Sequence, residues 1–418
     1  MCLNKASIYF PGLNALRFFA AFAVLISHVE LLKNNLRIQG DLWVDTAKEF
    51  STFSFIHILN GERHFLTPII SEIGSYGVVF FFVLSGFLIT YLLLAEKKKT
   101  NTVHVGHFYG RRILRIWPLY FLIMILGFFI LPNFELFNVG SQSNSLSENF
   151  TGNLILYAII LPNLAQAIFP PIPNIGQAWS IGVEEQFYLI WPIIVKKSKN
   201  VLKAIITVFV LILVSKILIV LLTSRDSYTI LKSFLASTKI ESMAIGALGA
   251  VAVFRNWKKA LNLVNNNFIF FISILFLPFS FYLIHPLFQD AWHIIMSVVF
   301  LVILINIAVA KRGLKLLESN ALNFLGKISY GIYMFHMMYC SLVINIAKNY
   351  FNWNSFSSLQ NILVYSSITL LTIFTSWLSY NYFEKIFLKK KSFGSLKSWI
   401  FFLLFPFLLI RLLFLDNL

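Results

Sequence analysis

The sequence predicts an all-α polytopic membrane protein with about ten transmembrane helices, because its composition and its apolar pattern agree. Hydrophobic residues make up 58% of the 418 residues, and the mean hydropathy is +0.78. Charged residues make up only 12%, whereas soluble globular proteins carry about 25%. Apolar runs of about 20 residues, the length that crosses a bilayer, recur along most of the chain.

The runs expected to cross the membrane follow one another from near the first residues to about residue 386. They cover 13–32, 76–95, 116–132, 180–196, 204–223, 234–254, 267–285, 291–310, 328–347 and 360–386. Two further apolar segments are ambiguous. Residues 153–169 contain Pro162 and lead into the sequence PPIPN, and residues 398–415 contain Pro406 and Arg411. The second segment is either an eleventh span at the C-terminus or a helix in the membrane interface.

The distribution of Lys and Arg favours a re-entrant or outer-surface segment near 153–178. If residues 153–169 do not cross, the basic clusters of the loops share one side: 97–99, 111–115, 196–203, 255–259, 311–315 and 385–397. The positive-inside rule makes that side the cytoplasm and places the N-terminus there. A re-entrant segment must be buried in protein or line a wet cavity, so we expect a cavity open to the outside.

Several other classes of function are disfavoured by the sequence. The net charge of +17 does not indicate a nucleic-acid partner, because the cations sit in short loops between spans. Cys2 and Cys340 make neither a disulfide framework nor a metal site. We find no Gly-rich phosphate loop, metal-ligand spacing or nucleophile elbow, and we expect neither a metal nor a permanently bound cofactor.

The first span carries ionisable residues at its two ends. Arg17 and His28 are three helical turns apart and share one face, about 16 Å apart along the axis. One interpretation is structural, with Arg17 snorkelling to the inner surface and His28 bonded to a neighbouring helix. The functional interpretation is a neutral imidazole that acts as a base, since burial disfavours the imidazolium form.

The sequence HFYGRRILRIWPLYFL at 107–122 places Arg112 and Arg115 one turn apart at the start of a span. Arginines in this position often anchor a span on its cytoplasmic side, next to an aromatic belt. The functional alternative is a phosphate clamp that faces the cytoplasm and is completed by Arg17, because guanidinium groups bind phosphate in a bidentate manner.

The sequence QAWSIGVEEQFYLIWP at 177–192 places two adjacent glutamates at the outer start of a span. Glu184 and Glu185 project about 100° apart on a helix, so at most one faces the cavity of His28. Solvation of both at the interface is the structural interpretation. The functional interpretation makes Glu184 a buried carboxylate that orients a base or binds a sugar hydroxyl.

A third pair of charges, Lys239 and Glu241, sits in the small-residue run KIESMAIGALGAVA, where Gly246 and Gly249 favour close helix packing. We interpret these two opposite charges as neutralising each other.

Tyrosine and histidine recur in the late sequence LGKISYGIYMFHMM at 325–338. Tyr330, Tyr333 and His336 have helical spacing, which is more often a packing or interface feature than a catalytic one. His285 and His293 flank an outer turn and are expected at the interface.

Taken in order, these motifs resemble the acyltransferase 3 family of bacterial membrane O-acyltransferases. The opening motif of that family is an Arg, ten intervening residues and then a His, here Arg17 and His28. The basic pair, the stretch WSIGVEEQFYLIWP and the stretch GKISYGIYMFH are similar to three further motifs of the family. The resemblance runs over about residues 10–388, leaving 389–418 as a basic linker and a C-terminal hydrophobic segment.

The sequence departs from the family pattern in two places. Asn14 stands in LNALR where Asp is common, and Lys239 and Glu241 stand where the family often has an Arg and an Asp.

The resemblance implies transfer of an acyl group, most often acetyl, from cytoplasmic acyl-coenzyme A to a hydroxyl of an extracytoplasmic glycan. The glycan would be lipopolysaccharide, capsule or exopolysaccharide, or a lipid-linked sugar, at the inner membrane of a bacterium. His28 and Glu184 are then the expected catalytic residues, with His28 as the base or as a transient acyl carrier. The expected donor-binding residues are Arg17, Arg112 and Arg115, and the expected substrate-binding residues are Trp179, Glu185, Tyr188, Tyr330 and His336.

The alternative from another class is a transporter or flippase of lipid-linked glycans. It explains the cavity and the intramembrane charges, but it predicts pseudo-repeats with broken helices at matching positions, which we do not find. The acceptor glycan, the length of the acyl chain and the oligomeric state do not follow from the sequence.

Overall fold

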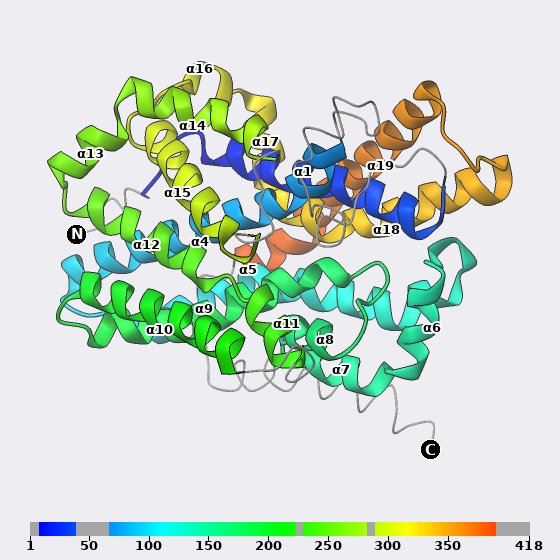
Figure 1. Ribbon diagram of the computed structural model, residues 1–418, viewed down its shortest axis with the longest axis horizontal. Coiled ribbons are helices and arrows are strands. Elements are labelled where there is room, and N and C mark those ends of the chain that lie inside the picture. The colour runs from blue at the N-terminus through cyan, green and yellow to red at the C-terminus, as the bar shows by residue number, and fades with distance from the viewer. Residues whose placement is uncertain (1–7, 39–66, 223–228, 282–288, 390–418) are drawn as a thin grey trace.

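A computed structural model describes residues 8–38, 67–222, 229–281 and 289–389 of the chain (Figure 1). Within these residues the regular structure is helical and no strand occurs, so the predicted fold class is confirmed. The ambiguous C-terminal segment 398–415 lies outside the described residues, as does His285.

The long helices match most of the predicted spans. They are α1 (Leu13–Asn35), α4 (Thr67–Thr100), α5 (Val105–Ile125), α9 (Trp179–Lys197), α10 (Val201–Leu222), α12 (Ile240–Phe254), α14 (Asn267–Ser280), α15 (Gln289–Ala308), α18 (Ser329–Phe351) and α19 (Ser358–Leu378). The shorter helices that connect or extend them are α6 (Ser141–Glu148), α7 (Phe150–Ala158), α8 (Pro162–Ile168), α11 (Thr229–Ser237), α13 (Lys258–Val264), α16 (Leu314–Leu317), α17 (Asn320–Lys327) and α20 (Lys385–Leu388).

Length and composition qualify 8 helices in the described residues as membrane spans, and 9 if α13 and α14, which meet at 51°, count as one span. Helix α9 is not in this set, because Glu184, Glu185 and Lys196 fall within its apolar run. The stretch before α9 forms only α7, α8 and a 3-10 turn at Gly176–Ala178, and none of these is long enough to cross a bilayer.

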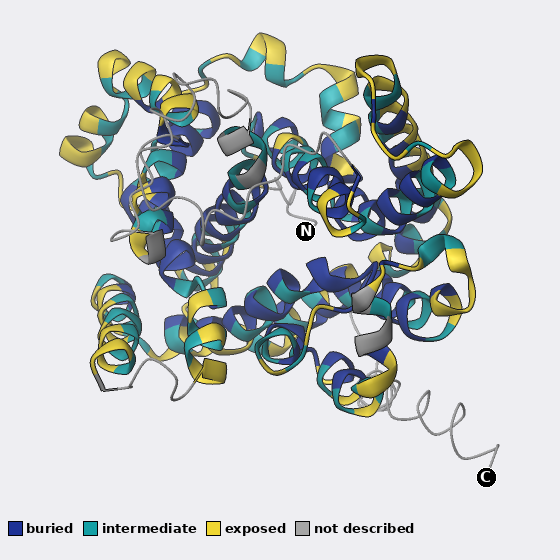
Figure 2. Cartoon of the chain, turned by 45° about the vertical axis from the view of Figure 1, so that its right-hand side comes forward, coloured by how far each residue is buried: buried dark blue, intermediate teal, exposed yellow. Residues whose placement is uncertain are grey.

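Helix α4 lies at the centre of the packing and contacts α1, α9, α12 and α15. Buried residues gather on these central helices, whereas peripheral helices such as α10 are largely exposed (Figure 2). The crossing of α4 and α12 depends on two glycines that face each other. A Cβ on Gly86 would overlap the carbonyl oxygen of Met243, and a Cβ on Gly246 would overlap the carbonyl oxygen of Val83. Glycine at both positions lets the two backbones touch.

Helix α1 is fixed at its start by contacts with the segment that precedes α18. The backbone N–H of Gly12 and the hydroxyl of Tyr9 donate to the carboxylate of Glu318. The amide of Asn14 donates to Asn323 Oδ1 at 2.9 Å. These bonds set the depth of α1 in the bundle, and they hold it beside α18, with which it also packs (Figure 1).

At the other end of α1, a buried ion pair joins Glu30 to Lys33 at 2.8 Å. Asn361 accepts a hydrogen bond from Lys33 Nζ at 3.1 Å, and Tyr365 donates to Glu30 Oε1 at 2.6 Å. Both ends of the helix that carries Arg17 and His28 are therefore anchored by polar contacts to later parts of the chain.

The crossing of α4 and α12 predicts a large effect for one added methyl group. Gly246→Ala should lower the free energy of unfolding by about 1–3 kcal/mol or more, because a backbone carbonyl cannot move as a side chain can. The measurement is the melting temperature of the purified protein in detergent. Gly106→Ala is the matched control, since no atom lies within 4 Å of a Cβ there. Equal melting temperatures for the two variants would contradict this account of the crossing.

Candidate active site

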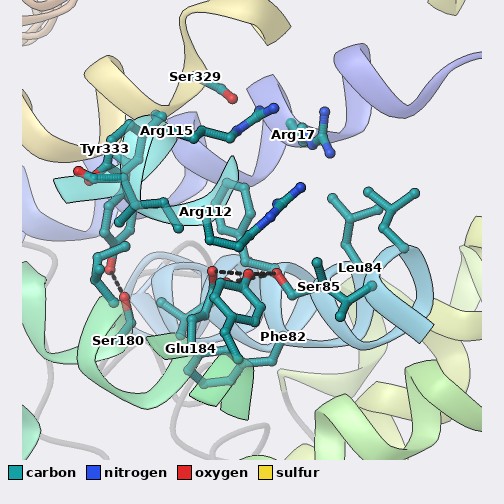
Figure 3. A pocket seen from close by; sticks show the side chains of 18 residues that line it. Arg17, Phe82, Leu84, Ser85, Arg112, Arg115, Ser180, Glu184, Ser329 and Tyr333 are labelled. Carbon is teal, nitrogen blue, oxygen red and sulfur yellow. Dashed lines mark hydrogen bonds between the residues drawn. The ribbon is translucent and has the colours of Figure 1, made fainter. Parts of the chain in front are cut away.

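A cavity of about 120 Å³ lies between α1, α4, α5, α9 and α18. Each of the five helices contributes at least one polar side chain to its walls, and together these side chains include basic, acidic and hydroxyl groups (Figure 3). The polar residues that line it are Arg17, Ser85, Arg112, Arg115, Ser180, Glu184, Tyr188, Ser329, Tyr330 and Tyr333.

Three arginines line this cavity from two helices. Arg17 enters from α1, and Arg112 and Arg115 enter from α5, where one helical turn separates them (Figure 3). Arg112 lies over the Phe108 ring, with its guanidinium carbon 5.8 Å from the ring centroid, and its Nε is buried without a hydrogen-bond partner. In the described part of the chain none of the three arginines forms a hydrogen bond or an ion pair. Three cations around one cavity favour the binding of an anion.

Glu184 is the acidic residue that lines the cavity, and it is held by two hydroxyl groups (Figure 3). Ser85 Oγ donates to Glu184 Oε1 at 2.9 Å, and the hydroxyl of Tyr188 donates to Oε2 at 2.7 Å. The expected neighbour of Glu184 is His28, but the structure gives it Ser85 and Tyr188 instead. One carboxylate faces three guanidinium groups, so the cavity keeps an excess of positive charge.

The position of Glu184 follows from the break in the chain before α9. The segment from α7 to the 3-10 turn at Gly176–Ala178 brings the start of α9 against α18, where Gln177 Nε2 donates to the carbonyl of Met334 at 2.7 Å. Glu184 therefore lies near the start of α9, as the sequence predicts, and inside the bundle beside the arginines.

His28 lies in contact with His336, which is 308 residues further along the chain. His28 Nδ1 and His336 Nε2 are 2.7 Å apart, and the two ring planes are within 6° of each other. His336 is 0% exposed, whereas His28 is only partly buried. The expected role of His336 is contact with the substrate, but the structure makes it the direct partner of His28.

The hydrogen bonds of this pair determine which nitrogen of His28 can accept a proton. His336 Nδ1 lies 2.7 Å from the carbonyl oxygen of Tyr333, and because a carbonyl can only accept, Nδ1 carries a hydrogen. In a neutral ring the Nε2 of His336 then has a lone pair and accepts from His28 Nδ1–H. That arrangement leaves His28 Nε2 with its lone pair and without a partner among the described residues.

Tyr333 connects the histidine pair with the arginine cavity. Its side chain lines the cavity, where its hydroxyl lies 2.7 Å from Ser180 Oγ and 3.0 Å from the carbonyl of Gln177. Its carbonyl oxygen accepts from His336, one turn along α18. One turn of α18 thus holds both the cavity wall and the hydrogen bond that orients the His336 ring.

The remaining predicted residues divide between the cavity and its surroundings. Tyr330 lines the cavity and donates to the carbonyl of Ile116 at 2.9 Å. Trp179 and Glu185 do not line it. Trp179 packs its ring against Phe82, and Glu185 Oε2 accepts from the indole of Trp117 at 3.1 Å.

Sequence reasoning missed Ser85, which lines the cavity and holds Glu184. The signal in the sequence is the Ser–Gly pair at 85–86 inside an otherwise apolar span. The pair has two uses here, because Gly86 permits the close crossing with α12 while Ser85 faces the cavity from the same helix.

The excess of positive charge predicts that phosphate-bearing anions stabilise the protein. Pyrophosphate should raise the melting temperature of the purified protein, because a ligand of the folded state adds RT ln(1 + [L]/Kd) to its stability. Arg112→Gln should abolish most of the shift. Arg111→Gln is the control, because Arg111 is on the same helix but does not line the cavity. It is exposed, and its Nη2 lies 3.6 Å from Glu96 Oε2. A shift that is equal in the two variants would exclude the arginine cavity as the anion site.

Comparison with known proteins agrees with the resemblance seen in the motifs. The O-acetyltransferase OatA of Staphylococcus aureus strain NCTC 8325 is 24% identical over 401 residues, which are 91% of this chain and 58% of that protein. An uncharacterized protein of Haemophilus influenzae is 28% identical over 210 residues, covering 47% of this chain and 83% of the relative. The chain therefore spans little more than half the length of the OatA relative. No solved structure is significantly similar to it.

The family comparison covers the whole site. The model of the family described as "Acyltransferase domain" matches residues 10–381, a range that includes the arginine cavity, Glu184 and both histidines. The chain therefore belongs to the acyltransferase 3 family.

Proposed function

We propose that the protein transfers an acyl group from cytoplasmic acyl-coenzyme A to a hydroxyl group of an extracytoplasmic glycan, and that this acyl group is acetyl. The observation that carries this proposal is the placement, on either side of Tyr333, of a cavity lined by three arginines and a histidine whose Nε2 keeps its lone pair. The name of the OatA relative, an O-acetyltransferase, agrees with acetyl as the group and oxygen as the acceptor atom.

The arginine cavity is the proposed site for the phosphates of the donor. Coenzyme A carries a pyrophosphate and a further phosphate, and guanidinium groups suit such anions. Arg115 is exposed while Arg17 and Arg112 are partly buried, so the cations lead from the surface inwards. The donor acts as a substrate, and its pantetheine arm would extend from the arginines towards the histidine pair.

The direction of the reaction across the membrane rests on the charge of the loops. The basic clusters lie with the starts of α1, α5 and α18 if α7 and α8 do not cross. The positive-inside rule then makes this end cytoplasmic and places the N-terminus in the cytoplasm. The inner membrane of a bacterium is the membrane that the family resemblance implies. Arg115 faces the donor compartment under this topology, and His28, three turns further along α1, lies closer to the acceptor.

In the proposed reaction His28 Nε2 removes the proton of the acceptor hydroxyl as the oxygen attacks the thioester carbonyl. The carbon–sulfur bond breaks, and the thiolate takes the proton from the imidazolium, which restores the neutral ring. In the second route Nε2 attacks the thioester carbon and the carbon–sulfur bond breaks, which expels the thiolate. The acceptor oxygen then attacks the acylated imidazole, the bond between Nε2 and the acyl carbon breaks, and the hydroxyl proton passes to the thiolate. Both routes require the tautomer that the hydrogen bond to His336 selects.

Surface-glycan mass in a deletion strain tests the proposed activity. Complementation with the wild-type gene should restore an increment of one acetyl group per repeat, and complementation with His28→Ala should not, because no base remains. Protein levels of the variant must equal those of wild type. Two results together would favour the transporter alternative over the enzyme. The deletion would lower the amount of glycan without changing its mass, and His28→Ala would complement the deletion fully.

The role of His336 as a positioning residue predicts a graded series. His336→Leu should lower the rate of transfer by about 100-fold, because nothing then holds His28 in the required tautomer. His336→Gln should recover a large part of this loss, since its amide oxygen can accept from His28 Nδ1–H. The KM for the acyl donor should stay unchanged in both variants because the arginines are intact. Equal losses in the Leu and Gln variants would point to a packing role alone.

A further inference from the structure

A buried ionic cluster outside the arginine cavity has its charges paired within the chain. Glu241 Oε1 accepts from Lys216 Nζ at 2.5 Å and lies 2.7 Å from His293 Nε2. This pairing corrects two expectations from the sequence. His293, expected at the membrane interface, is only 8% exposed. The ion-pair partner of Glu241 is Lys216, whereas the sequence suggests Lys239. Because Lys216 and Glu241 neutralise each other, this pair gives no reason to expect a charged ligand there.

Ser180 and Tyr333 place two hydroxyl groups on the wall of the arginine cavity (Figure 3). Both side chains are buried, with exposed fractions of 5% and 4%. The pair lies on a different side of the cavity from the guanidinium groups of the three arginines (Figure 3). The proposed reaction gives no role to either hydroxyl group.

The hydroxyl hydrogens of this pair are both used within the protein. The hydroxyl oxygen of Tyr333 lies 2.7 Å from Ser180 Oγ and 3.0 Å from the carbonyl oxygen of Gln177. Ser180 Oγ lies 3.4 Å from the same carbonyl oxygen. The carbonyl can only accept, and two hydroxyl oxygens as close as these need a hydrogen between them. One hydrogen therefore goes to the carbonyl and the other lies between the two hydroxyl oxygens, so only lone pairs are left to face the cavity.

Of the two oxygens, Ser180 Oγ has the greater capacity to accept. The shorter distance to the Gln177 carbonyl belongs to Tyr333, so Tyr333 donates there and Ser180 donates to Tyr333. Ser180 Oγ then accepts no hydrogen bond from the described residues. The same network argues against Ser180 as a nucleophile that carries the acyl group, because its hydrogen points to a phenol that is itself a donor and not to a base.

The cavity therefore offers different chemistry on two of its sides. The arginines can only donate hydrogen bonds, and the hydroxyl pair can only accept them. A ligand that suits both sides carries an anionic group and, further along, an N–H donor. The phosphates of acyl-coenzyme A are followed by the pantetheine arm, whose amide groups each have an N–H. We propose that Ser180 Oγ accepts a hydrogen bond from an amide N–H of this arm, an assignment that rests on the proposed function.

The position of Ser180 suits contact with the middle of the donor. Its partner Tyr333 lies next to His336 on α18, with the two ring centroids 5.9 Å apart, and His336 is the partner of His28. An arm that leaves the arginines and passes Ser180 therefore reaches the part of α18 that holds the histidine pair. Ser180 is then a substrate-binding residue that recognises the donor between its phosphates and its thioester.

Isothermal titration calorimetry of the full-length purified protein in detergent tests this hydrogen bond. The probes are coenzyme A and an analogue in which ester oxygens replace the amide N–H groups of the arm. Wild type should bind coenzyme A about tenfold more tightly than the ester analogue, because a hydrogen bond is lost and Ser180 Oγ is left unpaired in a buried site. Ser180→Ala should bind the two probes equally, since no acceptor remains to distinguish them.

Ser341→Ala is the matched control for this experiment. Ser341 is also a buried serine, and its hydroxyl donates to the carbonyl of Met337 at 3.2 Å, but it does not line the cavity. This variant should keep the tenfold preference of wild type. Because each protein is compared with itself on two probes, a general loss of stability or of phosphate binding does not change the ratio.

Equal binding of the two probes by wild type would overturn the proposal without any variant. A tenfold preference that survives in Ser180→Ala would also overturn it. If Ser180→Ala does not fold, Ser180→Cys serves in its place, because a thiol sulfur is only a weak acceptor. Failure of wild type to bind coenzyme A at all would overturn the proposed donor site together with this inference. Either of the first two results would remove the role of Ser180 alone and leave the proposed acyl transfer standing.

Discussion

Positive charge inside a membrane-spanning bundle has to be balanced by negative charge. Around the arginine cavity the side chains supply too few carboxylates to do so. Glu184 faces Arg17, Arg112 and Arg115, and hydrogen bonds from Ser85 and Tyr188 already hold its carboxylate. In the proposed function, the phosphates of the acyl donor complete the charge balance. The rest of the fold can be understood as the frame that keeps these charges together. Both ends of α1 are bonded to later segments, and the glycine crossing packs α4, which lines the cavity, closely against α12.

Helix α18 connects the two chemical parts of the site. The side chain of Tyr333 belongs to the cavity, and its carbonyl oxygen fixes the hydrogen on His336 Nδ1. His336 in turn receives the hydrogen of His28 Nδ1, which leaves the Nε2 of His28 as the available base. Because these bonds follow one another along one rigid helix turn, the geometry of the base is tied to the geometry of the cavity wall. In the proposed function, this connection is what lets His28 and the three arginines act on one substrate.

The sequence predicted the helical class and the grouping of Arg17, Arg112 and Arg115, because both depend on local patterns. Apolar length identifies spans, and helical spacing places Arg112 and Arg115 on one face. Contacts between distant segments were not predictable in this way. The pairing of His28 with His336 joins residues 308 positions apart, and no periodicity reports which helices meet. Glu184 lies beside the arginines and not beside His28, because the segment before α9 brings the start of that helix against α18. Burial of His293 depends on Lys216 and Glu241, which come from two other helices.

The most direct test of the account is the structure of the purified protein bound to a non-reactive acyl-coenzyme A analogue, determined by cryo-electron microscopy. The account predicts phosphate density among Arg17, Arg112 and Arg115, with the sulfur atom of the analogue pointing past Tyr333 towards His28 Nε2. Both features have to be present together, because the proposed transfer needs the phosphates at the arginines and the thioester at His28 at the same time. Phosphates bound at another place in the molecule, or a sulfur atom directed away from the histidine pair, would contradict it.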